Sequence, residues 1–253
     1  MQLVEKYRPK TLNDFIGMTR TRAILSSFAL NPYPSAWLFL GPSGLGKTTM
    51  ALALADELRA EVHHVASKSC DMETVNAICH KCHYIPLAGR WHCVVVDEAD
   101  QISNAAQLAF LSKLDGTAAP PDTIFLFTAN DTSLLKDRFL SRCRTLRFST
   151  DDVLKPLSEF LQTVYRAEAP NQPEPDYRAI AKESGLNIRQ ALMNLELEII
   201  SPRPAVSFTA TTDIPASYDK IRYRAIMKLK AEGRIDKSIP NNRVPKALWV
   251  AAL

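Results

Sequence analysis

The octapeptide GPSGLGKT, Gly41 to Thr48, constrains the fold of this chain more than any other stretch of the sequence. The apolar run WLFL leads into it, and the helix-forming stretch MALALADEL begins two residues after it. It matches G-x-x-x-x-G-K-[ST], whose glycines let the backbone curl until successive N–H groups face phosphate oxygens. A strand, this loop and a helix in that order predict an α/β fold with a site for nucleotide phosphates.

Individual residues of this loop have distinct expected roles. Lys47 should reach the β- and γ-phosphates, and the Thr48 hydroxyl should ligate Mg²⁺. A loop with only a structural role is the alternative, and the flanking strand and helix argue against it. The residues predicted to bind nucleotide here are Gly41, Pro42, Ser43, Gly44, Leu45, Gly46, Lys47, Thr48 and Thr49.

A second motif, VVVDEAD, places carboxylates at the end of an apolar run. Asp97 is positioned to hold the Mg²⁺ shell, and Glu98 to polarise a water for attack on the γ-phosphate. Acidic residues are common in loops after strands, so this motif gains its weight from the phosphate loop. Together the two motifs predict hydrolysis of a nucleoside triphosphate and not simple binding.

Five short apolar runs alternate with helical patterns between residues 37 and 149. Near-continuous apolar runs of this length are typical of strands that are covered on both faces, and intervening helices predict a parallel sheet. The runs are Trp37–Leu40, Val62–Ala66, Cys93–Val96, Thr123–Thr128 and Thr145–Phe148.

After Thr150 the pattern is helical. Leu157, Phe160, Leu161 and Val164 fall on one helical stripe, and Asn187 is a predicted N-cap for a helix that follows it. Residues 201–217 are rich in proline, serine and threonine, which is typical of a linker. The expected domains are therefore 1–150 for the α/β core, 151–200 for a small helical domain, and 201–253 for a linker and basic tail.

Charge and composition narrow the class of protein. The net charge is +4, and the part of the chain from Ser201 onward contains ten Lys/Arg and four Asp/Glu. This basic tail is expected either to contact a polyanion or to be simply solvated. No apolar run approaches the ~20 residues of a membrane span, and the first residues lack a secretory signal. Five cysteines argue against a disulfide framework. We expect a cytoplasmic location, associated with the nucleoid, or a nuclear one.

The motifs together resemble an AAA+ ATPase, and within that class a clamp-loader ATPase subunit of the replication factor C small-subunit type. VEKYRPKTLNDFIG, GPSGLGKTT, DEAD, TAN, SRC and GLNIRQAL carry the resemblance, which covers about residues 2–200. It implies a P-loop AAA+ core with a parallel five-stranded sheet, a helical lid, and ATP with Mg²⁺ as cofactors. It also implies an ATPase that DNA stimulates, with other AAA+ subunits, a sliding clamp and primer–template DNA as partners and no membrane contact.

The same resemblance implies roles for residues outside the two motifs. Tyr7, Arg8 and Pro9 should line the adenine pocket, and Asn130 matches a first sensor of the γ-phosphate, although a turn residue is the alternative. Arg189 matches a second sensor. Its expected place in the first turn of a helix opposes the helix dipole, so a nearby anion such as ATP phosphate would offset that cost.

The stretch KDRFLSRCR carries four cations, and the resemblance assigns them different roles. Arg142, in the SRC motif, should act in trans on the ATP of a neighbouring subunit. Arg138 lies one helical turn earlier and is a second candidate for that role. Lys136 and Arg144 are expected to be solvated or to meet acidic groups of the neighbour.

Three cysteines raise a further possibility, a structural zinc. Cys70, Cys79 and Cys82 have the spacing of the first three zinc ligands in bacterial clamp-loader subunits, but Ile85 occupies the fourth position. Buried apolar cysteines on a helix are the favoured alternative. The residues that would have to substitute for the fourth ligand are His80, His83 or Cys93.

Some 50 residues follow the predicted lid, and they lack the pattern of the helical collar that such subunits usually carry. We therefore expect a tail that is truncated or divergent relative to a collar. Two other functions remain open: a different DNA-associated AAA+ motor, for branch migration or helicase loading, and a non-catalytic regulatory subunit that binds ATP. EKYRP and SRC favour clamp loading, and Lys47, Asp97 and Glu98 argue against a non-catalytic role.

Overall fold

The computed structural model describes residues 2–87, 89–115, 119–151, 153–201 and 226–233. The chain divides into two compact units, residues 1–203 and 204–253. In the second unit, the described residues include a helical segment at 226–231. Most of the predicted linker and basic tail lies outside the described residues. The separation of residues 1–150 and 151–200 into distinct domains stays a prediction.

The first unit contains a five-stranded parallel sheet with the order β2-β3-β4-β1-β5. No strand end differs by more than two residues from its predicted position, and the expected AAA+ fold class is confirmed. Every residue of the central strand β4 is buried, because helices cover both faces there. The strands are β1 (Ser35–Leu40), β2 (Glu61–Ala66), β3 (His92–Asp97), β4 (Thr123–Ala129) and β5 (Arg144–Arg147).

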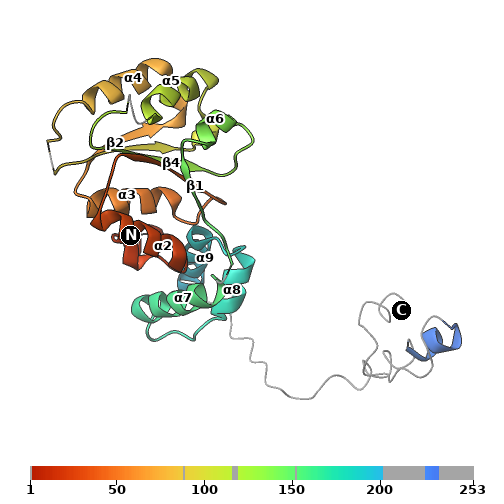
Figure 1. Ribbon diagram of the computed structural model, residues 1–253. Helices are drawn as coiled ribbons and strands as arrows, with labels where there is room; N and C mark the ends of the chain where they lie inside the picture. The colour runs from red at the N-terminus through yellow and green to blue at the C-terminus, as the bar shows by residue number, and fades with distance from the viewer. Residues whose placement is uncertain (1, 88, 116–118, 152, 202–225, 234–253) are drawn as a thin grey trace. The chain divides into compact units, whose positions relative to one another are not determined.

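Helices pack on both faces of this sheet (Figure 1). On one face, α2 (Thr19–Leu30) and α3 (Lys47–Glu57) bury Leu25, Met50 and Leu54 in a core with Phe39 and Val95 from the strands. We call this the α3 face. On the other, the α4 face, α4 (Met72–Lys81) and α5 (Asn104–Leu114) form a second core with the strands.

Aromatic rings give the α4 face much of its packing. Phe110 on α5 lies edge-on to Phe127 of β4, with 5.1 Å between ring centroids. Phe127 also contacts Phe139, on the short helix α6 (Asp137–Leu140), at 4.9 Å. Edge-to-face pairs at these distances contribute roughly 0.5–1.5 kcal/mol each beyond simple burial. They anchor α6, and with it the SRC turn, to the sheet.

A third core joins the helices α7 (Leu154–Glu168), α8 (Tyr177–Glu183) and α9 (Ile188–Ile200). Leu157, Leu161 and Val164 are fully buried in it, as their helical spacing predicts, whereas Phe160 of the same stripe is half-buried at its margin. Leu3, on the short helix α1 (Leu3–Lys6), packs into the same core, so the start of the chain is attached to these helices. In Figure 1 they lie beyond α2 and α3, away from α4 and α5.

Three short 3₁₀ helices complete the described elements: η1 (Leu12–Asp14), η2 (Ser67–Ser69) and η3 (Ala99–Gln101). None of the helices in the described part of the chain is long and apolar enough to cross a membrane. Because all five strands are parallel, the loops that follow β1, β3 and β4 meet at one edge of the sheet, where ligands bind in open α/β folds.

Candidate nucleotide site

The phosphate loop lies between β1 and α3, and its glycines are required by their surroundings. A Cβ on Gly41 would collide with the carbonyl oxygen of Phe148, which follows β5. Gly44 has φ +79°, and a Cβ there would collide with the Asn187 side chain. The sequence pattern therefore reflects both the curl of the loop and the close approach of two other segments.

Lys47 is buried at the start of α3, and its ammonium group is fully engaged. Its Nζ donates to the carbonyl oxygens of Gly41, at 2.7 Å, and Pro42, at 2.9 Å, and to Oδ1 of Asn130, at 3.0 Å. Burial lowers the pKa of Lys47, an effect that the carboxylates of Asp100 and Asp97 oppose. A phosphate at this position would exchange neutral carbonyl acceptors for a charged one, which is the stronger partner.

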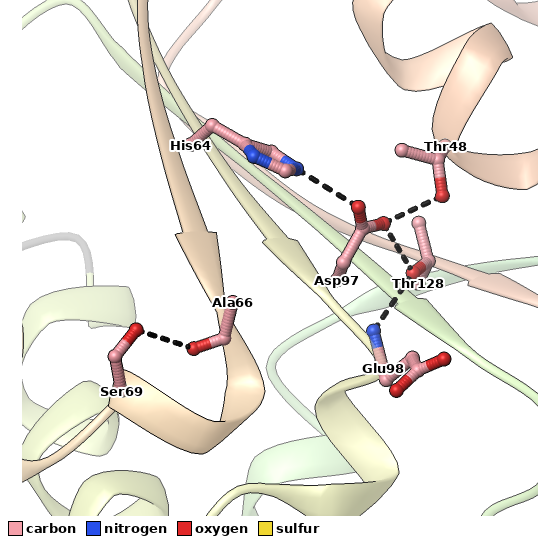
Figure 2. Close-up of polar contacts among 7 residues, drawn as sticks. All are labelled: Thr48, His64, Ala66, Ser69, Asp97, Glu98 and Thr128. Carbon is pink, nitrogen blue, oxygen red and sulfur yellow. Dashed lines mark hydrogen bonds and ion pairs between the residues drawn. The ribbon is translucent and has the colours of Figure 1, made fainter.

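Asp97 is the centre of a hydrogen-bonded group at the end of β3, shown in Figure 2. Its Oδ1 accepts from the hydroxyls of Thr48, at 2.6 Å, and Thr128, at 2.9 Å. Its Oδ2 accepts from Nε2 of His64 at 2.8 Å. A hydroxyl and a carboxylate side by side are hard oxygen ligands, so Thr48 and Asp97 fit a Mg²⁺ ion.

His64 was not anticipated from the sequence. It lies on β2, two residues before Ala66, and Ala66 pairs with Asp97 in the sheet register. Alternate residues of a strand share a face, so His64 and Asp97 both belong to the α3 face. The repeated histidines of VHHVA are visible in the sequence, but only the pairing of β2 with β3 identifies which of them meets Asp97.

Glu98 follows Asp97 in a left-handed backbone conformation, with φ +52° and ψ +48°. Its backbone N–H donates to the Thr128 hydroxyl at 3.1 Å, and its side chain is exposed. Figure 2 shows the Glu98 carboxylate outside the hydrogen-bonded group around Asp97. This geometry leaves the carboxylate available to a water molecule, as a general base requires.

A pocket next to the phosphate loop collects the predicted adenine-binding residues. Its walls are formed by the N-terminal segment, the phosphate loop, α7 and α9, and they are mainly apolar. They include one cation from the N-terminal segment, Arg8, and one from α9, Arg189. This composition fits a planar base with a phosphate chain attached. Its lining includes Tyr7, Arg8, Pro9, Leu45, Gly46, Thr49, Phe160, Ile188, Arg189 and Leu192.

Tyr7 fixes the N-terminal segment to α7. Its hydroxyl donates to Oε1 of Glu168 at 2.5 Å, and the same oxygen accepts from Nζ of Lys6 at 2.6 Å. Burial and the Glu168 carboxylate raise the pKa of Tyr7 to about 12. The ring also meets Phe160 edge-on, at 6.2 Å between centroids. The wall of the pocket is thus held in place without nucleotide.

Asn187 connects the phosphate loop to α9. As predicted, it is the N-cap, and its Oδ1 accepts from the backbone N–H of Gln190 at 3.0 Å. Its Nδ2 also donates to the carbonyl oxygen of Ser43 at 3.0 Å, which the sequence did not indicate. Arg189 lies in the first turn of α9, exposed and near enough to Lys47 to contribute to lowering the pKa of that lysine.

Arg142 has its contacts elsewhere in the chain. Its Nε and Nη2 donate to both oxygens of Asp115, at 2.7 and 3.1 Å, and its Nη1 donates to the Arg138 carbonyl oxygen at 2.8 Å. Asp115 is the C-cap of α5. This pair raises the pKa of Arg142 and lowers the pKa of Asp115. Asp115 and the Arg138 carbonyl therefore fix the orientation of the guanidinium, which remains partly accessible. Among the described residues, it donates to none of the groups around Lys47.

The other cations of KDRFLSRCR differ from one another. Lys136 and Arg138 are exposed, in agreement with the expectation for Lys136. Arg144, by contrast, lies over the rings of Tyr33, at 5.1 Å, and Trp37, at 5.8 Å. It is exposed, yet its position is set by these aromatic contacts, which the sequence did not indicate.

The three cysteines of the possible zinc pattern lie in the core of the α4 face. Burial raises the thiol pKa of Cys70 and Cys79 to about 11 and that of Cys82 to about 12. A zinc knuckle needs turns between its ligands. This segment instead forms the continuous helix α4. Among the described residues, the one group of three potential ligand atoms within 4.8 Å of one another contains Cys82 but neither Cys70 nor Cys79.

Known proteins resemble this chain in sequence and in structure. Residues 37–150 match the family model described as ATPase family associated with various cellular activities (AAA). Replication factor C small subunit 1 of Pyrobaculum arsenaticum is 30% identical over 203 residues, covering 77% of this chain and 56% of the relative. Replication factor C subunit 4 of Saccharomyces cerevisiae is 31% identical over 207 residues, with 76% and 62% covered. The chain thus spans less than two thirds of the length of these relatives.

Among solved structures, a mutant of RuvB from Thermotoga maritima matches with a TM-score of 0.63 over 76% of this chain and 65% of that one. At 21% identity, this likeness is one of fold. The sequence relatives are more specific, because replication factor C subunits from archaea, yeast and a plant align with most of the first unit. The chain belongs to the AAA ATPases of the clamp-loader family, and the relatives that it resembles in sequence are replication factor C subunits.

Proposed function

We propose that this chain hydrolyses ATP as one subunit of a clamp-loader-like AAA+ complex. The observation that carries the proposal is the convergence of Lys47, Thr48, Asp97, Glu98 and Asn130 at one edge of the sheet. Each type of group that phosphoryl transfer to water needs is present there: a cation for phosphate, oxygen ligands for Mg²⁺, a carboxylate base and a polar amide. The pocket beside them accepts the adenine.

The contacts support a distinct role for each side chain when ATP binds. Lys47 exchanges the carbonyl oxygens of Gly41 and Pro42 for β- and γ-phosphate oxygens, while Asn130 stays within reach of the γ-phosphate. Thr48 and Asp97 would hold Mg²⁺, which neutralises charge that develops on the phosphates. Glu98 orients and deprotonates the attacking water. Arg189 adds a second cation from the lid side of the pocket.

Arg142 serves the site of a neighbouring subunit in this proposal. Its guanidinium contacts Asp115 and no group of its own nucleotide site within the described residues. To reach a neighbour's γ-phosphate it must leave Asp115 and exchange the two-point contact with that carboxylate for one with phosphate oxygens. Arg138, which is exposed one turn earlier, is the second candidate for the same contact.

The partners follow from the family and stay part of the proposal. Other AAA+ subunits, a sliding clamp and primer–template DNA are the expected partners, with a nucleoid or nuclear location. Hydrolysis should be stimulated by DNA, and the cations that the sequence places after residue 201 would add phosphate contacts.

The decisive experiment measures phosphate release by the purified full chain, with any partner subunits it needs, with and without primed DNA. We expect hydrolysis that requires Mg²⁺ and rises with primed DNA. Glu98→Gln should bind ATP and lose hydrolysis by about a hundredfold or more, because the base is removed and the phosphate contacts remain. Hydrolysis that survives this substitution unchanged would refute the role of Glu98. Hydrolysis that is indifferent to DNA would leave an ATPase and refute the clamp-loader proposal.

A further inference from the structure

A second cluster of polar side chains lies on the opposite face of the sheet from Asp97. His63 on β2, His92 at the start of β3 and Cys82 at the C-cap of α4 place one ligand atom each within 4.8 Å of one another. His92 and Cys82 are buried, and His63 is half-buried. Only Cys82 belongs to the cysteine pattern of the sequence, and the two histidines come from strands that the pattern does not include.

The hydrogen bonds of His92 determine which of its nitrogens can bind a metal. Nε2 lies 2.9 Å from the carbonyl oxygen of Tyr84, which can only accept, so Nε2 carries the proton. Nδ1 therefore presents its lone pair, and it lies 3.0 Å from Nε2 of His63. In the absence of a metal this lone pair accepts a hydrogen bond from His63 Nε2. A ring N–H held by a backbone carbonyl is the usual state of a histidine whose other nitrogen binds zinc.

The remaining charges near the cluster suit a divalent cation. Oε1 of Glu61 lies 4.0 Å from Nε2 of His63, while Oε2 of the same carboxylate accepts from the Leu87 backbone N–H at 2.7 Å. One carboxylate and one thiolate balance two positive charges. Lys81 is near enough to His63 to act on it electrostatically, and its positive charge opposes a bound metal.

We propose that His63, Cys82 and His92 bind a structural Zn²⁺ ion, with the Glu61 carboxylate or a water as fourth ligand. Nitrogen and sulphur ligands in a tetrahedral set are the preference of zinc, whose ligand atoms lie roughly 3.3–3.6 Å apart. Nε2 of His63 and Nδ1 of His92, which lie 3.0 Å apart, must therefore open slightly, and a pair at the 4.8 Å limit must close by about 1.5 Å. On binding, the Cys82 thiol releases its proton to solvent, and the His63 proton moves from Nε2 to Nδ1, so that one proton is lost in total.

The position of the cluster defines what the ion would do. It joins two neighbouring strands at the edge of the sheet to the end of α4 and to the connection that carries Tyr84. The site lies on the α4 face, near the start of β2 and β3, whereas Asp97 ends β3 on the α3 face. The zinc is thus structural and separate from Mg²⁺, and this inference does not depend on the proposed ATPase activity.

The test measures zinc in the full chain, purified without a polyhistidine tag, by mass spectrometry of the metals. We expect on the order of one zinc per chain, and at least a tenfold loss in Cys82→Ser and in His63→Gln. Replacement by Co²⁺ should give a thiolate charge-transfer band that Cys82→Ser lacks. His63→Gln is the safer of the two variants, because His63 is only half-buried and its loss disturbs the core less.

Two control variants make the outcome unambiguous. Cys79→Ser removes an equally buried thiol of the same core and should retain zinc. Asp97→Asn removes the predicted Mg²⁺ ligand and should also retain it. Wild-type protein that stays free of zinc after incubation with the ion, or zinc that survives both Cys82→Ser and His63→Gln, overturns the proposal. An equal loss of zinc in Cys79→Ser and Cys82→Ser would also overturn the proposal, because it would reflect damage to the core.

Discussion

At the scale of single residues, the nucleotide site depends on one carboxylate with several neighbours. Asp97 accepts hydrogen bonds from Thr48, Thr128 and His64, so its orientation is fixed before a metal arrives. Thr128 also receives the N–H of Glu98, which connects the proposed metal ligand to the proposed base. Groups that orient a metal ligand affect metal binding nearly as much as the ligand does.

This arrangement makes His64 a positioning residue with a measurable effect. His64→Ala should raise the Mg²⁺ concentration needed for half-maximal ATP hydrolysis by about tenfold, because Asp97 loses the partner of its second oxygen. Initial rates across a Mg²⁺ titration provide the measurement. His80→Ala is the control, since His80 is exposed on α4. Among the described residues, its one aromatic contact is with the ring of Tyr84. An unchanged Mg²⁺ dependence in His64→Ala would remove His64 from the site.

A second residue-scale prediction concerns Arg142 and can be tested by mixing two inactive proteins. Glu98→Gln lacks its own base, and Arg142→Ala lacks the group that it offers to a neighbour. Each should be inactive alone, but assemblies in which the two alternate should regain hydrolysis, because Glu98 and Arg142 then meet at the same interface. ATPase assays at varied mixing ratios measure this effect.

The mixing experiment has its own controls. Arg142→Ala should bind ATP like the wild type, which a fluorescent nucleotide titration would show. Arg144→Ala removes a nearby cation that is held over Tyr33 and Trp37, and it should hydrolyse ATP normally. If Arg142→Ala loses its own ATP binding, the arginine acts within its own chain and the proposal of action in trans is wrong.

At the scale of elements, the parallel sheet brings the loops after β1, β3 and β4 to one edge, and α9 closes the pocket from the other side. Asn187 is the connection between the two parts, since it caps α9 and donates to the phosphate loop at Ser43. The collision that a Cβ on Gly44 would have with Asn187 shows how closely they approach. The beginning of α9, including Arg189, is therefore positioned by the loop that is predicted to bind phosphate.

Replacing Asn187 separates the stability of α9 from its contact with nucleotide. Asn187→Ala should lower the free energy of unfolding by about 1 kcal/mol, because the cap is lost, and should weaken ATP binding as well. Asp176→Ala is the matched control, since Asp176 caps α8 through the N–H groups of Arg178 and Ala179 and does not line the nucleotide pocket. Urea unfolding and ATP titration measure the two effects. Equal loss of ATP affinity in both variants would contradict a specific role for Asn187.

At the scale of the whole molecule, the first unit has three hydrophobic cores within residues 1–203, two on the faces of the sheet and one among α7, α8 and α9. The predicted adenine pocket and the Mg²⁺ site are both formed by residues of this unit. After residue 203 the sequence carries nine Lys/Arg and four Asp/Glu, a net charge of +5.

A chain that ends at residue 203 should therefore unfold cooperatively and bind ATP with unchanged affinity. Its affinity for primed DNA should fall, and the slope of that affinity against salt concentration should become shallower, because phosphate contacts are lost. Thermal unfolding, ATP titration and DNA binding at several salt concentrations are the measurements. Unchanged DNA affinity and salt slope would show that the basic tail makes no phosphate contacts.

The sequence by itself determined the local features of this protein. Apolar runs predicted the five strands, and burial on both faces explains the runs of β1, β3 and β4, whereas most residues of the edge strands β2 and β5 are exposed or half-buried. The glycines of the phosphate loop reported a backbone shape. Asn187 could be identified as a cap because an N-cap side chain bonds to backbone groups only a few residues further along the chain. The roles proposed for Lys47, Asp97 and Glu98 likewise came from short motifs.

Only the tertiary structure decided the contacts between distant segments. The strand register selects His64 for Asp97 and places His63 with His92 on the opposite face, and a one-residue shift of the register would exchange them. Cysteine spacing suggested a ligand set of Cys70, Cys79 and Cys82, but a continuous α4 places only Cys82 beside the histidines. Side-chain chemistry is local and can be read along the chain, whereas the meeting of side chains requires the packing of strands and helices in three dimensions.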